Sequence, residues 1–107
     1  MIDIENIKKE IVQRLKPINA NKIILFGSYA YGTPNKDSDL DIMILKQNYN
    51  NKWEEIKQAR KYLKNIRVPK DILVEKVDYF QSHIDENWIN SVWYEANKYG
   101  EILYAKE

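Results

Sequence analysis

The sequence predicts a mixed α/β or α+β fold, because stretches with helical spacing of apolar residues alternate with short apolar runs. The 107 residues are expected to form one domain, 1–107, around a single hydrophobic core. A hydrophobic content of 44% and a charged content of 31% are typical of a soluble globular protein. No repeat or low-complexity tract occurs, and the pattern alone does not separate α/β from α+β.

Composition also excludes several classes of function. The chain has no cysteine, which excludes zinc–thiolate sites, disulfides and thiol nucleophiles. No apolar run reaches about 18 residues and no signal-peptide pattern opens the chain, so a cytoplasmic location without membrane contact is expected. The net charge of +1 argues against direct nucleic-acid binding driven by electrostatics. The glycine motifs of P-loop and dinucleotide-binding proteins are absent.

The first elements are a helix and a strand. Residues 3–16 carry one apolar face, with Asp3 as a candidate N-cap and Pro17 as the residue that ends the helix. The apolar run 22–26 predicts a strand, and 28–32 predict a helical turn.

The central elements are two strands around a helix. The runs 40–45 and 71–77 predict strands, and 52–66 predict the helix between them. The inner face of that helix is expected to comprise Trp53, Ile56, Ala59, Leu63 and Ile66.

The end of the chain should be helical and then extended. Asp78 is expected to cap a short helix that continues through His83. A longer helix is predicted over 86–99, closed by Gly100 and followed by a brief strand over 102–104.

Two aspartates at the start of the second strand indicate a metal site. Side chains alternate along a strand, so Asp39 and Asp41 face one way while Leu40 and Ile42 face the core. Two ionised carboxylates side by side repel each other unless a cation lies between them. The alternative is that the two aspartates bind no metal and lie at a solvated strand entrance, where aspartate is common.

Gly27 and Ser28 follow the first strand and suit a phosphate. A glycine gives unhindered backbone N–H groups, and the serine adds a hydroxyl near a helix N-terminus. Capping of the helical turn is an alternative role for Ser28 that uses the same geometry. A phosphate site next to a hard-metal site suggests phosphoryl or nucleotidyl transfer.

The stretch 26–45 resembles the minimal nucleotidyltransferase domains of the DNA polymerase β-type superfamily. Their signature is Gly-Ser, ten residues and Asp-x-Asp, and Gly27-Ser28 followed by Asp39-x-Asp41 has this spacing. The resemblance implies a small mixed β-sheet flanked by helices, with the Gly-Ser strand next to the Asp-x-Asp strand.

The resemblance also implies the roles of individual residues. Two Mg²⁺ ions would be held by the three catalytic carboxylates, which are Asp39, Asp41 and Asp71. The nucleotide, expected to be ATP, would be bound by Gly27, Ser28 and Ser38. In the family, the third carboxylate helps to deprotonate the attacking hydroxyl.

Two features leave alternatives open. Asp71 leads an apolar strand, which suits the third carboxylate, and Glu75 and Asp78 are the fallback candidates. Tyr31 stands where many relatives carry arginine, so Lys36 would have to supply a cation for the triphosphate.

Stand-alone domains of this kind resemble the MNT antitoxins that pair with HEPN-type ribonuclease toxins. There the resemblance implies AMP transfer to a toxin tyrosine, and Trp88 or Trp93 in the last helix would serve as anchors for the partner. One alternative is an aminoglycoside-type nucleotidyltransferase that acts as a homo-oligomer. Another is a non-catalytic module that only sequesters the toxin.

Overall fold

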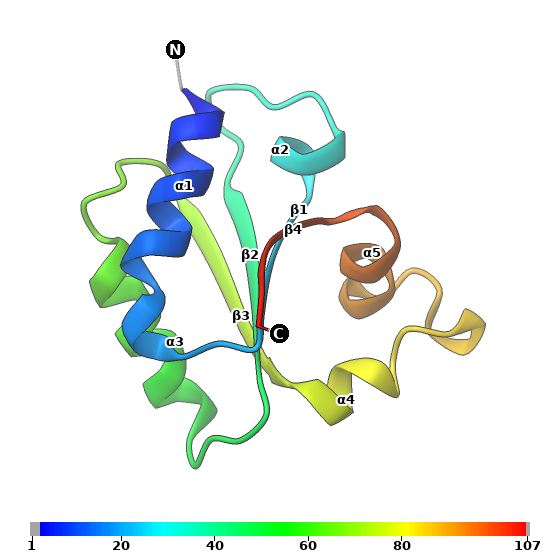
Figure 1. The fold of residues 1–107 in the computed structure, drawn as a ribbon. Helices are drawn as coiled ribbons and strands as arrows, with labels where there is room; N and C mark the ends of the chain where they lie inside the picture. The colour runs from blue at the N-terminus through cyan, green and yellow to red at the C-terminus, as the bar shows by residue number, and fades with distance from the viewer. Residues whose placement is uncertain (1–2, 107) are drawn as a thin grey trace.

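In the computed structural model the chain is described over residues 3–106. Its four strands form one sheet in the order β3-β2-β1-β4 (Figure 1). The central β1 (Lys22–Phe26) runs antiparallel to both β2 (Leu40–Lys46) and β4 (Glu101–Ala105). β2 runs parallel to β3 (Lys70–Lys76). The mixed sheet confirms the predicted fold class.

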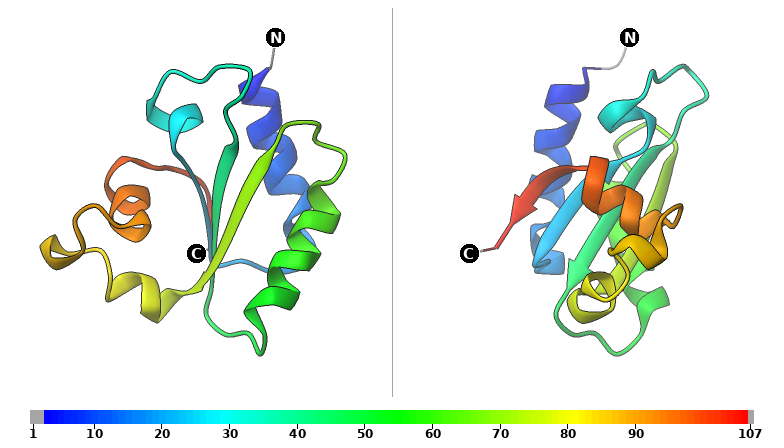
Figure 2. Two further views of the ribbon diagram at one scale, coloured as in Figure 1. Left: turned by 180° about the vertical axis from the view of Figure 1, so that it is seen from behind. Right: turned by 90° about the vertical axis from the view of Figure 1, so that its right-hand side faces the viewer.

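Helices cover both faces of this sheet (Figures 1 and 2). α1 (Ile4–Arg14) and α3 (Lys52–Leu63) cover one face, which is called the first face below. α4 (Val77–Gln81) and α5 (Val92–Tyr99) cover the second face. No helix within residues 3–106 combines the length and apolarity that a membrane crossing needs.

Strict alternation along β2 divides the core in two. Leu40, Ile42 and Ile44 pack toward α1 and α3, whereas Met43 and Leu45 pack toward α4 and α5. Both sets are almost fully buried because helices lie on both faces of this central strand. Asp41 has the same parity as Met43, so its carboxylate lies at the end of the second face.

The N-terminal elements agree closely with the sequence prediction. Asp3 caps α1 and accepts a hydrogen bond from the Asn6 backbone N–H at 3.2 Å. Pro17 lies in a short 3₁₀ helix, Lys16–Ile18, immediately after α1. Both features follow from local chemistry, since proline has no N–H to continue an α-helix.

The prediction for α3 is wrong in two details. The helix ends at Leu63 rather than at residue 66. Trp53 is 74% exposed and does not belong to the inner face. At about 100° per residue, position 53 lies roughly a quarter of a turn from the middle of the stripe that Ala59 and Leu63 define.

The expected cap of α4 and the last long helix are also wrong. Lys76 is the N-cap of α4, so Asp78 lies within the first turn. Residues 86–99 form a 3₁₀ helix, Glu86–Trp88, and then α5, with Asn90 between them at φ 78°. This left-handed residue ends the first helix, and the Ser91 hydroxyl caps the second by accepting from the Tyr94 N–H at 3.1 Å.

Candidate active site

Three of the predicted site residues meet where β1 ends and β2 and β3 begin. Phe26, the last residue of β1, pairs with Asp41, and Asp41 pairs in turn with Asp71 on β3. Directly paired residues point to the same face of a sheet, and neighbouring strands lie about 4.8 Å apart. The pairing therefore makes the carboxylates of Asp41 and Asp71 neighbours, and Gly27 follows Phe26 at the same sheet end.

Gly27 is required by the way the chain turns out of β1. Its φ is +74°, which lies in the region that favours glycine. A Cβ atom at this position would clash with Oδ2 of Asp41. The Gly-Ser corner thus lets the Asp41 carboxylate lie directly against the backbone from which α2 (Ser28–Tyr31) starts.

The Asp41 carboxylate is under strong electrostatic stress. Burial, followed by the negative charges of Asp71, Asp39 and Glu95, raises its pKa to about 6. Both effects disfavour the ionised form, because a desolvated charge surrounded by like charges has little to stabilise it. A cation bound beside Asp41 would instead favour the ionised form of this carboxylate.

The donor set fits Mg²⁺ in its chemistry. Carboxylate oxygens are the ligands that Mg²⁺ prefers, and at least one of these carboxylates lacks a compensating charge. Within residues 3–106, however, no three histidine, cysteine, aspartate or glutamate side chains are arranged as a metal-binding group. The three predicted ligands thus occupy neighbouring positions without converging on one point in this structure.

Asp39 and Ser38 belong to the loop that enters β2. Asp39 is exposed one residue before the strand begins. The Ser38 hydroxyl accepts a hydrogen bond from the Asn35 backbone N–H at 2.9 Å, so it fixes the loop rather than the carboxylates.

Ser28 is the first residue of α2 and is not its cap, since Gly27 occupies the N-cap position. The first backbone N–H groups of a helix have no partner within the helix. A cavity of about 680 Å³ lies beside Ser28. Its lining comprises Ile4, Ser28, Tyr29, Gly32, Pro34, Asn35 and Lys36. Lys36 therefore shares a cavity with the serine, as a substitute cation for the triphosphate would have to do.

Glu95 on α5 is a site residue that the sequence analysis missed. Its charge acts on Asp41, and its carboxylate faces the hydroxyl of Tyr31 on α2. Burial, and then Glu95, raise the pKa of Tyr31 to about 12. The Tyr31 ring also lies 5.6 Å from the ring of Tyr99. No spacing in the sequence connects α5 to the Asp-x-Asp strand, so only the fold brings Glu95 here.

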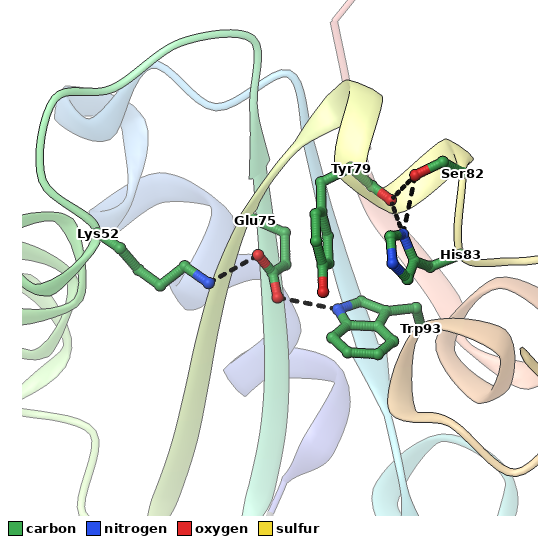
Figure 3. A network of polar contacts seen from close by, with 6 residues as sticks. All are labelled: Lys52, Glu75, Tyr79, Ser82, His83 and Trp93. Carbon is green, nitrogen blue, oxygen red and sulfur yellow. Dashed lines mark hydrogen bonds and ion pairs between the residues drawn. The ribbon is translucent and has the colours of Figure 1, made fainter.

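Glu75 is not suited to be the third carboxylate. It is 6% exposed, and Figure 3 shows both of its oxygens engaged. Oε1 accepts from Lys52 Nζ at 2.8 Å and Oε2 from the Trp93 indole N–H at 2.9 Å. Asp78 is exposed on α4, which follows the far end of β3. Of the three candidates, only Asp71 lies opposite Asp41.

His83 has a structural setting, as lone histidines usually do. Its Nδ1 lies 2.7 Å from the Tyr79 carbonyl and 2.8 Å from the Ser82 hydroxyl, and its ring stacks on Tyr79 with centroids 3.9 Å apart (Figure 3). Trp93 contacts the same rings and packs against the second core, so it is no free anchor. Trp88, at the edge of this cluster, is 37% exposed.

The structure thus places a glycine corner against a pair of aspartates at one end of a mixed sheet. The chain belongs to the nucleotidyltransferase domain family, whose model matches residues 4–97. A comparison with curated protein sequences finds no match.

Solved structures share the fold. A mutant of the toxin–antitoxin MntA–HpeT is 17% identical, with a TM-score of 0.66, over 94% of this chain and 74% of that one. A toxin–antitoxin with AMP-PNP is 20% identical, with the same TM-score and the same coverage. The tri-AMPylated Shewanella oneidensis HEPN toxin with MNT antitoxin gives 16% identity and a TM-score of 0.59, over 92% of this chain and 70% of that one. These likenesses establish the architecture.

Proposed function

We propose that the protein is a Mg²⁺-dependent adenylyltransferase that acts as an antitoxin. It would transfer AMP from ATP to a tyrosine hydroxyl of a HEPN-type toxin and release pyrophosphate. The observation that carries the proposal is the pairing of Asp41 with Asp71 beside Gly27, in a chain of the nucleotidyltransferase family.

The choice of nucleotide and partner rests on the similar structures. One of them is a toxin–antitoxin with AMP-PNP, an ATP analogue, and another contains a tri-AMPylated HEPN toxin with its MNT antitoxin. Their folds match more than nine-tenths of this chain. Similar folds host different acceptors, so the acceptor is the part of the proposal that most needs a test.

The residues of the chain would divide the work between binding and proton transfer. The backbone N–H groups at Gly27 and Ser28, with the Ser28 hydroxyl, would bind the phosphates. Lys36 would add a positive charge from the adjoining cavity. Asp71, exposed at the start of β3, would accept the proton of the attacking hydroxyl.

Asp39, Asp41 and Asp71 would hold two Mg²⁺ ions, which supply charge neutralisation for the phosphates when bound. Asp41 gains most from such ions, since its ionised form is the one that burial and its neighbours disfavour. Catalysis would then consist mainly of positioning and electrostatic stabilisation, as is usual for phosphoryl chemistry.

Intact-mass spectrometry tests the function directly. The protein is incubated with Mg²⁺, ATP and the protein encoded beside it, and the expected result is an added AMP on a tyrosine of the second protein. The same reaction with GTP, CTP or UTP defines the nucleotide. Modification of an aminoglycoside in place of any protein would refute the antitoxin role while leaving the nucleotidyltransferase activity intact.

A further inference from the structure

β4 lies at the edge of the sheet and has no strand on its outer side among residues 3–106. Figure 2 shows this strand beside β1, at the opposite edge from β3. Two of its apolar side chains are notably open to solvent, since Ile102 is 55% exposed and Tyr104 is 37% exposed. An edge strand with apolar side chains and no proline is open to pairing with another strand.

The side chains of β4 are distributed over the two faces in an unusual order. Glu101 forms an ion pair with Lys8 of α1 at 2.8 Å and therefore lies on the first face. Tyr104 pairs with Ile23, which belongs to the same core, whereas Ile102 pairs with Ile24 of the second core.

An irregularity in the pairing explains this order. The register between β1 and β4 shifts at Leu103, which leaves Leu103 and the next residue, Tyr104, on the first face. Ala105 pairs with Lys22 and so lies on the second face. The Lys106 ammonium donates to Asn19 Oδ1 at 3.0 Å, beside the C-terminal end of α1.

In order from residue 101 to residue 106, the side chains lie on the first, second, first, first, second and first face of the sheet. This order is the same in both directions about a point between Leu103 and Tyr104. An antiparallel pair of two such strands, related by a twofold axis at that point, matches every side chain with one on the same face. Shifting the pairing by one residue would put opposed side chains on opposite faces.

The matching register is also complementary in charge. It places Glu101 opposite Lys106 of the second copy on the first face, twice in each dimer. Opposite charges facing one another across an antiparallel pair are stabilising. Leu103 meets Tyr104 of the second copy at the centre, over the groove that β4 forms with Val12 and Lys16 of α1.

We propose that the protein forms a twofold dimer through antiparallel pairing of β4 with β4 of a second copy, in the register that joins Glu101 to Lys106. The pairing continues the sheet from four strands into the second molecule. Asp71 lies on β3 at the opposite edge, so the candidate active site stays uncovered. The dimer stands independently of the proposed function.

Sedimentation equilibrium on the isolated protein tests the dimer. The expected mass is twice the 12.8 kDa of one chain. Glu101→Lys and Lys106→Glu should each raise the dissociation constant of the dimer about tenfold or more, since each creates two like-charge pairs. The double variant with both charges exchanged should return the constant to within about threefold of the original.

Glu5→Lys provides the matched control. It removes a salt bridge to Lys8, as Glu101→Lys does, but from the N-terminal turn of α1. Its dissociation constant should stay unchanged, and circular dichroism should show that all variants are folded. A monomer at every concentration up to millimolar would overturn the proposal, and so would a dimer that ignores the charge reversals or is not rescued by the exchange.

Discussion

Asp41 on β2 lies directly opposite Asp71 on β3, in a parallel pairing that keeps register from Leu40 with Lys70 to Lys46 with Lys76. The two carboxylates are therefore fixed relative to each other by consecutive backbone hydrogen bonds rather than by a flexible loop. A site built on strands holds its geometry better than one built on loops.

Nucleotide binding should require a divalent cation. Asp39→Asn or Asp41→Asn should each weaken Mg·ATP binding, because these carboxylates would hold the metal that carries the triphosphate. Calorimetric titration of the protein with ATP, once in the presence of Mg²⁺ and once in EDTA, measures the difference in affinity. Equal affinity for ATP in the two conditions would remove the basis for a metal site.

Asp71→Asn should lower the rate of transfer while sparing nucleotide affinity. Losing the proton acceptor lowers the rate at least ~10²-fold, whereas ATP affinity should change only a few-fold. Single-turnover kinetics and equilibrium binding separate the two quantities. Asp78→Asn is the matched control, because Asp78 is equally exposed but follows the far end of β3. If the control lost activity and Asp71→Asn kept it, the third carboxylate would be misassigned.

The metal-free protein should become less stable as the pH rises through about 6. The folded-state pKa of Asp41 is raised from 3.8 to about 6, so the folded protein binds the proton more tightly than the unfolded chain does. This contribution to stability is fully present below 3.8 and is lost as the pH passes the folded-state value.

Asp41→Asn isolates that contribution. In EDTA the variant should have a higher Tm than the original protein well above the folded-state pKa, and the difference should shrink well below it. Thermal unfolding across this pH range measures the effect, and saturating Mg²⁺ should reduce it by compensating the charge. A difference in Tm that does not depend on pH would contradict the electrostatic account.

Gly27→Ala should destabilise the protein and weaken nucleotide binding. The added methyl group would clash with Asp41 Oδ2, and the positive φ adds a backbone cost of about 1 kcal/mol. The double variant Gly27→Ala/Asp41→Ala should recover part of the lost stability, because it removes the clash but keeps the backbone strain. Denaturant unfolding of the three variants measures the coupling. Strictly additive losses would show that the two groups do not touch.

The two partners of the Lys52–Glu75 ion pair should differ in their effect on stability. Lys52→Met leaves a carboxylate that is 6% exposed without its cation, which should lower the free energy of unfolding by ~1–3 kcal/mol. Glu75→Gln keeps an acceptor for Trp93 and leaves only an ammonium that reaches solvent, so its cost should be smaller. Urea unfolding at constant m-value ranks the two. A larger loss of stability for Glu75→Gln than for Lys52→Met would mean that Lys52 depends more on the ion pair than Glu75 does.

Local chemistry made much of the fold predictable from sequence. The strand Lys22–Phe26 was predicted with its observed bounds, because an apolar run that stops at a glycine leaves little choice of limits. The Asp3 cap is equally local. Asn90 broke the last predicted helix because asparagine tolerates a left-handed backbone, a possibility that helical periodicity does not register.

The candidate site was less predictable where it depends on long-range contacts. The motif gave the positions of Gly27, Asp39 and Asp41, whereas only the β2–β3 register distinguishes Asp71 from Glu75. Glu95 reaches the site through the packing of α5 on the second face. The residues next to Glu95 in the sequence do not predict this position.

The parallel pairing of Asp41 with Asp71 also bears on the order of events during folding. The two residues are separated by α3 in the chain, and a parallel pair needs such a crossover before its first hydrogen bond can form. Closing that loop costs chain entropy before any contact compensates it, so non-local parallel strands pair slowly. The hairpin of β1 and β2, which already unites Gly27 with Asp41, can form earlier. A nascent chain would thus bring Gly27 and Asp41 together first and Asp71 later. A transfer activity that needs all three residues would appear only with the later step.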